Sequence, residues 1–159
     1  HLFLHDEAYT VLGTKGLVNP PLRKHSDCEA LWEAIHDGTI DTIGTDHAPH
    51  TIEEKMSPFR SAPSGFPSIE LYFPLLLNAY HEKKISLKQI VHLTHTRPQE
   101  IFHLPLHDDL VLVDLNKTKI VEDRALKTKA KWSPYQGRTL QGWPKYTILA
   151  GKLFDLEVL

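Results

Sequence analysis

Apolar and polar positions along the middle of the chain repeat at helical spacing. The pattern from Ile69 to Lys83 predicts a long helix with an irregularity at Pro74. Ser86 is a typical N-cap and predicts a second helix that ends near Leu93. Arg97–Phe102 predicts a third, short helix. The middle of the chain is therefore expected to be mainly helical.

The earlier part of the chain predicts a helix with extended segments on either side. Ser26 or Asp27 is expected to cap an amphipathic helix that ends at Asp37-Gly38. Ile40–Thr45 alternates between apolar and polar residues, which predicts a strand. Leu17–Arg23 contains two prolines, which exclude a helix, so it predicts a short strand ending in a rigid loop.

Beyond Leu104 the pattern becomes that of β-structure. Leu110–Leu115 predicts a strand, and the segments on either side of Ala150-Gly151 predict a hairpin. The fold class is therefore expected to be α/β, with an α/β portion over residues 1–104 and an all-β portion over residues 105–159. The polar loop Thr51–Pro67 is long enough to predict an active-site lid.

Composition excludes several classes of function. The 159 residues are 41% apolar and carry a net charge of −2, which is typical of an ordinary soluble domain and favours neither nucleic-acid nor membrane binding. Cys28 is the single cysteine, which excludes an internal disulfide and is compatible with a reducing compartment, so the expected location is the cytoplasm. The chain begins at His1 without a targeting segment, and we expect it to lack its own beginning.

The segment Asp46-His47-Ala48-Pro49-His50 is the strongest candidate for chemistry. An aspartate that ends a strand can ligate a metal ion and exchange a proton with a metal-bound water. His50 follows a stiff proline and is expected to donate a hydrogen bond over the same pocket. The alternative is a turn at the end of a strand with two solvated histidines.

Four ordered motifs resemble those of the dihydroorotases, which are cyclic amidohydrolases of pyrimidine biosynthesis. Asp46–Thr51 followed by Glu53-Glu54-Lys55 is similar to their signature. The other three matches are His1–Leu4, Val18–Arg23 and Ala62–Pro67. The resemblance covers nearly the whole chain.

This resemblance implies a role for each of five residues. Asp46 would ligate zinc and act as general acid and base, while Asn19 and His50 would hold the carboxylate and ring of the substrate. The backbone at Ser64 and Gly65 would contact the ring amide. The reaction implied is the reversible closure of N-carbamoyl-L-aspartate to dihydroorotate with loss of water.

The resemblance also implies that the chain is incomplete. Residues 1–104 would form the C-terminal part of a (β/α)8 metal-dependent hydrolase barrel, and residues 105–159 the C-terminal strands of a small β-sandwich domain. A full barrel needs about 250 residues. The intact enzyme would hold one or two zinc ions, but Asp46 is the one expected ligand in this chain and the N-terminal ligands are lacking. The missing part of the barrel is then the expected partner, with a homo-oligomer or a pathway enzyme as further possibilities.

Two alternatives stay open. Hydantoinases and allantoinases share the architecture but usually differ at the position of His50, so a histidine there favours a ring substrate that bears a carboxylate. The second alternative is a non-catalytic dihydroorotase-like module that binds a partner enzyme.

Overall fold

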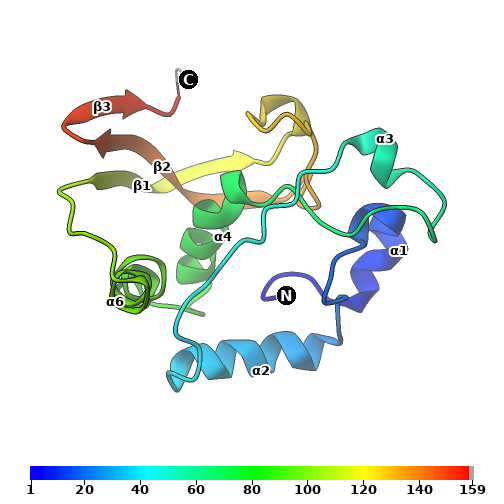
Figure 1. Ribbon diagram of the computed structural model, residues 1–159, viewed down its shortest axis with the longest axis horizontal. Coiled ribbons are helices and arrows are strands. Elements are labelled where there is room, and N and C mark those ends of the chain that lie inside the picture. The colour runs from blue at the N-terminus through cyan, green and yellow to red at the C-terminus, as the bar shows by residue number, and fades with distance from the viewer. Residues whose placement is uncertain (158–159) are drawn as a thin grey trace. The chain divides into compact units, whose positions relative to one another are not determined.

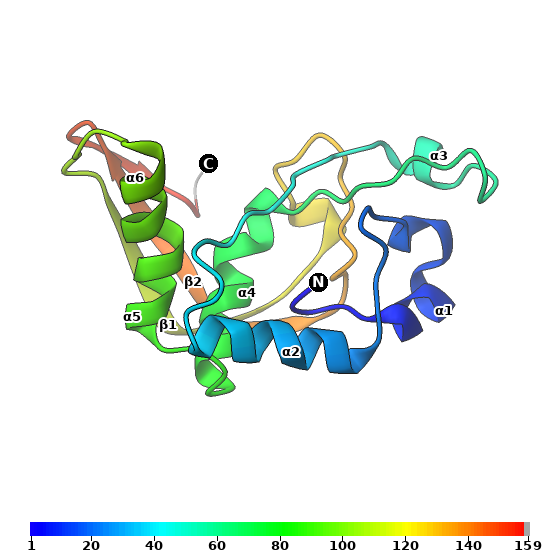
Figure 2. The same ribbon diagram turned by 60° about the horizontal axis from the view of Figure 1, so that its bottom comes forward.

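The structure, a computed structural model, describes residues 1–157 (Figures 1 and 2). Short helices connected by loops dominate the first two thirds of the chain, and strands follow. The helical elements are η1 Asp6–Ala8, α1 Tyr9–Leu12, η2 Gly13–Gly16, α2 His25–His36, α3 Ile52–Lys55, α4 Ile69–His81, α5 Leu87–Val91, the π-helical turn η3 His92–Thr96, α6 Arg97–Phe102 and η4 Asp123–Ala125. The strands are β1 Leu110–Ile120, β2 Thr139–Leu149 and β3 Lys152–Asp155.

The chain divides into two compact units whose segments interleave along the sequence. Unit 1 comprises His1–Ile40, Gly44–Glu70 and Val121–Arg138. Unit 2 comprises Asp41–Ile43, Leu71–Ile120 and the described residues from Thr139 onward. Each unit joins segments from both sides of residue 104, so the domain boundary expected there stays a prediction.

The sheet of unit 2 is a three-stranded antiparallel meander in the order β1-β2-β3. The predicted hairpin is confirmed, because β2 and β3 pair across Ala150 and Gly151, which both have positive φ. Gly142 of β2 lies against Leu77 of α4 so closely that a Cβ at residue 142 would be 2.6 Å from the Leu77 Cβ. The absence of a side chain there lets α4 pack directly on the sheet.

The helices predicted for the middle of the chain are confirmed. Helix α4 spans the predicted segment but ends at His81, and its buried side chains are Leu71, Pro74, Leu75, Leu76, Leu77 and Ala79. Ser86 caps α5 as expected, since it forms a capping box with Gln89. Helix α6 has the predicted bounds. The π-helical turn η3 between them has no signal that we identified in the sequence.

Helix α2 is the long helix of unit 1 and begins earlier than expected. Its N-cap is Lys24 rather than Ser26 or Asp27, and no side chain caps it. Its end at Asp37 agrees with the prediction. The buried face includes Trp32, whose Nε1 donates to the Leu2 carbonyl at 3.1 Å, so the helix holds the apolar start of the chain in place.

The two strands predicted in the first part of the chain are wrong. Neither Leu17–Arg23 nor Ile40–Thr45 is a strand. The backbone groups of Ile43 are bonded instead to other partners: its N–H donates to the Leu93 carbonyl at 3.3 Å, and its carbonyl accepts from the Tyr72 hydroxyl at 2.8 Å. A strand needs a neighbouring strand to pair with, and none of the described segments supplies one here.

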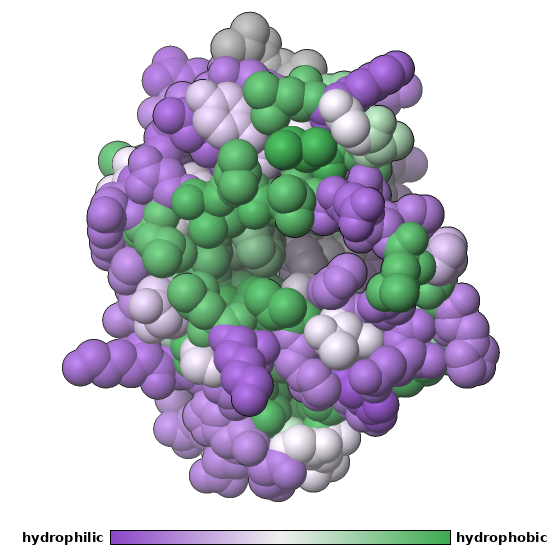
Figure 3. All heavy atoms as spheres, turned by 90° about the vertical axis from the view of Figure 1, so that its left-hand side faces the viewer, coloured by the Kyte–Doolittle hydropathy of each residue, from purple (hydrophilic) through white to green (hydrophobic). Residues whose placement is uncertain are grey.

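Apolar side chains gather on one face of the chain (Figure 3). The face shown in Figure 3 is the left-hand side of Figure 1, where the β2–β3 hairpin and α6 of unit 2 are drawn. The large apolar side chains exposed in that unit include Phe102, Leu104, Leu106, Leu110, Val111, Leu112, Leu149 and Leu153. None of the helices among residues 1–157 combines the length and the apolar character needed to cross a membrane.

Candidate functional site

All five residues predicted for the site lie in unit 1, although up to 46 positions separate them in the sequence. Asn19 and Asp46 are exposed, His50 and Ser64 are partly buried, and Gly65 is buried. Their segments are joined by backbone hydrogen bonds rather than by a strand ladder. The site therefore depends on how three loops are held together.

The first loop is the one that carries Asp46. Asp46 has a φ of 43°, in the left-handed region that few residues other than glycine adopt. His47 follows in an isolated parallel bridge with Phe66, and the Ala48 N–H donates to the Phe66 carbonyl at 2.9 Å. This pairing places the Asp46 segment beside the loop Ala62–Pro67, which is called the glycine loop because it carries Gly65.

The His47 ring supports the start of α4. Its Nδ1 accepts from the backbone N–H groups of Ser68 at 2.9 Å and Ile69 at 3.1 Å. These are N–H groups at a helix start that have no partner within the helix. His47 therefore caps the start of α4, and its Nδ1 is occupied by these two hydrogen bonds.

The backbone carbonyl of His50 is hydrogen-bonded, and a carboxylate lies close to its ring. Its carbonyl accepts from Trp132 Nε1 at 2.8 Å, and its Nδ1 lies 3.7 Å from Glu54 Oε2. Glu54 forms a capping box with Thr51 at the start of α3, and the hydrogen bond from the Thr51 N–H is the main cause that lowers the pKa of Glu54. An ionised carboxylate thus faces the imidazole. The sequence motifs do not include Trp132, because a contact over 82 positions leaves no local signal.

The glycine loop contacts both the Asp46 segment and the Asn19 segment. Gly65 has a φ of 135°, and a Cβ there would lie 2.5 Å from the Ala48 Cβ and 3.3 Å from His50 Cδ2. Its N–H donates to the Leu17 carbonyl at 2.9 Å, two positions before Asn19. The Gly65 N–H is thus already bonded, so the group that this residue can offer to a ligand is its carbonyl.

Lys55 is a second residue that sequence reasoning did not assign to the site. It is fully buried in unit 1, and its Nζ donates to the carbonyls of Leu17 and Pro63, which lie in two different loops. A lysine is rarely buried without a charge partner, so the sequence alone favours an exposed one.

The polar side chains predicted to meet a substrate are available for it. Within residues 1–157, the side chains of Asn19, Asp46 and Ser64 make no hydrogen bond to another side chain or to the backbone. The described residues bring together no group of three His, Cys, Asp or Glu side chains that could hold a metal ion. The residues present here therefore do not fit a zinc site by themselves.

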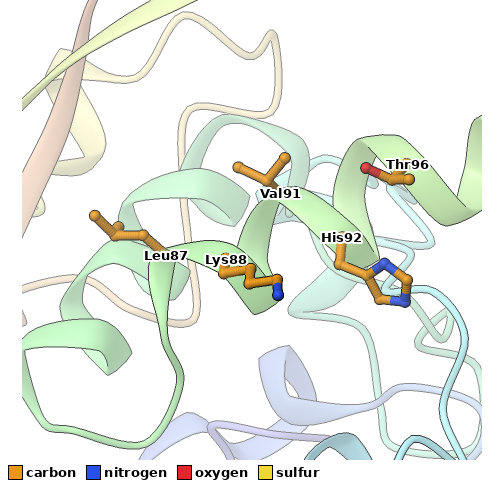
Figure 4. A pocket seen from close by; sticks show the side chains of 5 residues that line it. All are labelled: Leu87, Lys88, Val91, His92 and Thr96. Atoms are coloured by element: carbon orange, nitrogen blue, oxygen red, sulfur yellow. The ribbon is translucent and has the colours of Figure 1, made fainter.

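Unit 2 contains a surface cavity of about 460 Å³. Figure 4 shows its lining side chains along α5 and η3: Leu87, Lys88, Val91, His92 and Thr96. Two of its lining side chains, Leu87 and Val91, are aliphatic, and none of the five predicted site residues contributes to it. We assign the candidate site to the three joined loops, because they carry the five residues that the motifs predict.

Comparisons with curated proteins find dihydroorotases. The chain is 42% identical to the dihydroorotase of Bacillus subtilis (strain 168) over 161 residues, which cover 96% of this chain and 38% of that protein. It is 38% identical to the dihydroorotase of Halobacterium salinarum over 159 residues. These matches confirm the resemblance that the motifs predict. The chain spans 38% of the length of the Bacillus relative, and no family model matches it.

Solved structures similar to this chain include hydantoinases and a dihydroorotase-like domain. The L-hydantoinase of Arthrobacter aurescens has a TM-score of 0.90 at 25% identity, over 97% of this chain and 37% of that one. An inactive dihydroorotase-like domain of a multifunctional protein from Chaetomium thermophilum has a TM-score of 0.69 at 24% identity. The expected α/β class is thus confirmed at the level of the amidohydrolase fold.

Proposed function

We propose that this chain, a relative of the dihydroorotases over nearly its whole length, is the substrate-binding and acid–base part of a dihydroorotase. The single observation that carries the proposal is the joining of three motif segments in unit 1. The Ala48 N–H donates to the Phe66 carbonyl, and the Gly65 N–H donates to the Leu17 carbonyl. Residues that the dihydroorotase motifs assign to one pocket are thus held on adjacent loops.

The proposed chemistry needs one proton-transfer group. In ring opening, the Asp46 carboxylate accepts a proton from the attacking water as the water oxygen bonds to the ring carbonyl carbon. It then gives that proton to the leaving ring nitrogen as the carbon–nitrogen bond breaks. Ring closure runs the same transfers in reverse. The exposure of Asp46 supports this role, since an acid–base group must reach the substrate.

Substrate binding falls to the other four residues. Asn19 and His50 are proposed to donate hydrogen bonds to the substrate carboxylate. The carbonyl of Gly65 would accept from a ring N–H, and Ser64 would contribute its backbone beside it. The ionised Glu54 opposite His50 Nδ1 supports an imidazole that is oriented for donation.

The remaining features of a complete enzyme lie outside this chain in our proposal. The intact protein would form the (β/α)8 barrel with a small β-sandwich domain, and other segments would supply the zinc ligands that accompany Asp46. The apolar face of unit 2 supports a further protein segment as partner, because soluble chains rarely expose apolar areas of this extent. A cytoplasmic location and a homo-oligomeric or pathway partner stay predictions.

A chimeric enzyme tests the proposal directly. This chain would replace the aligned 38% of the Bacillus subtilis dihydroorotase. We expect the chimera to convert dihydroorotate to N-carbamoyl-L-aspartate, and to act far more slowly on dihydrouracil, which lacks the carboxylate. A folded chimera that turns over dihydrouracil or hydantoin but not dihydroorotate would contradict the proposal.

His50→Ala is expected to weaken this preference for the carboxylate. Loss of a hydrogen bond to a charged group corresponds to a rise in KM for dihydroorotate of roughly ten- to a hundredfold. The KM for dihydrouracil should stay unchanged, because that ring offers no carboxylate to His50. His107→Ala, which changes an exposed loop histidine, is the matched control. An equal loss for both substrates would assign His50 to the fold instead.

A second candidate function is a non-catalytic dihydroorotase-like module. Two observations favour it: the similar domain from Chaetomium thermophilum is inactive, and residues 1–157 form no group of three metal ligands. The chimera separates the two candidates. A chimera that folds and binds dihydroorotate without any turnover would favour the module.

A further inference from the structure

Lys55, the last residue of α3, has an unusual environment for a lysine. Its exposed fraction is 0%. Its Nζ donates to the Leu17 carbonyl at 2.9 Å and to the Pro63 carbonyl at 2.7 Å. Two of the three ammonium N–H groups are thus bonded to backbone oxygens from different loops.

Two aromatic rings and no carboxylate complete this environment. The Lys55 Nζ lies 6.0 Å from the centre of the Phe66 ring and 5.9 Å from the Trp132 ring. Within the described residues, no carboxylate forms an ion pair with it. Burial lowers the pKa of the Lys55 ammonium. A buried cation without a counter-charge is costly, so a neutral residue of this length would serve packing alone equally well.

The two carbonyls that Lys55 binds belong to the substrate-binding segments. Leu17 lies two positions before Asn19, and Pro63 lies immediately before Ser64 and Gly65. The Leu17 carbonyl also accepts from the Gly65 N–H at 2.9 Å, so this one oxygen is bonded to both Lys55 and the Ser64-Gly65 segment. The two residues whose rings lie near the ammonium also contact the Asp46 loop. Phe66 forms a β-bridge with His47, and the Trp132 Nε1 donates to the His50 carbonyl.

We propose that Lys55 is a positioning residue of the candidate site: its buried ammonium holds the Asn19 segment and the Ser64-Gly65 segment at a fixed separation. The inference deepens the proposed function and rests on it, since those segments are assigned to the substrate. Lys55 does not touch the substrate. It fixes the distance between groups that do.

Amide hydrogen exchange tests the positioning without reference to any activity. In the 159-residue chain, Lys55→Met keeps the length of the side chain and removes its charge and donors. Loss of hydrogen bonds from a charged group should speed exchange at the Gly65 amide by at least roughly tenfold. Amides of the β2–β3 hairpin in unit 2 should keep their rates. Unchanged exchange at Gly65 would overturn the inference.

Steady-state kinetics of the chimera separate positioning from general stability. Lys55→Met should raise KM for dihydroorotate by roughly tenfold and leave kcat within about twofold, because ground-state contacts are misplaced while Asp46 is retained. A purely structural role would instead reduce the folded fraction, which lowers the apparent kcat at constant KM. Lys129→Met, at an exposed lysine of unit 1, is the matched control and should change neither constant.

A second variant covers the case in which Lys55→Met does not fold. Lys55→Gln keeps an N–H donor without the charge, and it should show the same rise in KM to a smaller extent. Wild-type KM in Lys55→Gln or Lys55→Met would overturn the inference. A wild-type chimera without turnover would overturn the proposed function, and the exchange rate of Gly65 would then decide on Lys55 alone.

Discussion

Asp46→Asn is expected to lower kcat of the chimeric enzyme by roughly 10²- to 10⁴-fold in both directions of the reaction, which is the usual contribution of a general acid–base group. The substitution removes the charge and the proton acceptor while it keeps the shape of the side chain. Rates for dihydroorotate opening and N-carbamoyl-L-aspartate closure would be measured separately. The two should fall together, because the same group takes part in both.

The local backbone makes Asn a well-matched replacement. Asp46 has a φ of 43°, and aspartate and asparagine are the residues other than glycine that adopt this region most readily. The fold of unit 1 should therefore be unaffected, and the unfolding midpoint in urea checks this. Asp108→Asn, in an exposed loop, is the control. A variant that keeps more than about a tenth of the wild-type kcat would exclude Asp46 as the acid–base group.

The elements that sequence predicted correctly have local causes. Ser86 and Gln89 are three positions apart and form their capping box without help from the rest of the chain. Ala150 and Gly151 likewise form the turn between β2 and β3 from adjacent residues. Alternation in Ile40–Thr45 is a weaker signal, because a strand exists only if a neighbouring strand pairs with it. The described chain supplies a helix carbonyl and a tyrosine hydroxyl there instead.

The same distinction between local causes and distant contacts applies to the residues of the candidate site. Asp46, His50 and Gly65 stand in short motifs, so their types and spacing could be recognised in the sequence. Lys55 also stands in the signature, but its role and that of Trp132 could not be assigned, because both roles arise from contacts with residues far away along the chain. A lysine that follows two glutamates is typical of an exposed helix end, and only the fold shows that it is buried and bonded to the carbonyls of two loops.

Gly65→Ala is expected to destabilise unit 1 by about 3 kcal/mol or more, the sum of backbone strain and overpacking. The φ of 135° lies in a region that glycine adopts almost alone. The added Cβ would also lie 2.5 Å from the Ala48 Cβ and 3.1 Å from the Ala48 carbonyl oxygen. Backbone atoms cannot move aside as a flexible side chain would, so the glycine loop must shift away from the aspartate segment. Urea unfolding of the 159-residue chain gives the free energy of unfolding.

Two controls separate the strain from the steric overlap. Gly137 lies in the same unit with a φ of 81°, and an added Cβ there would meet no atom within 4 Å, so Gly137→Ala measures strain alone, about 1 kcal/mol. Ala48→Gly combined with Gly65→Ala removes the shortest contact and should recover part of the loss, which appears as a coupling free energy in the double-mutant cycle. The chimera carrying Gly65→Ala should also bind dihydroorotate more weakly, because the alanine side chain would lie against His50. Equal costs for Gly65→Ala and Gly137→Ala would mean that the glycine loop is not held against the Asp46 segment, and the three-loop site would then lose its structural basis.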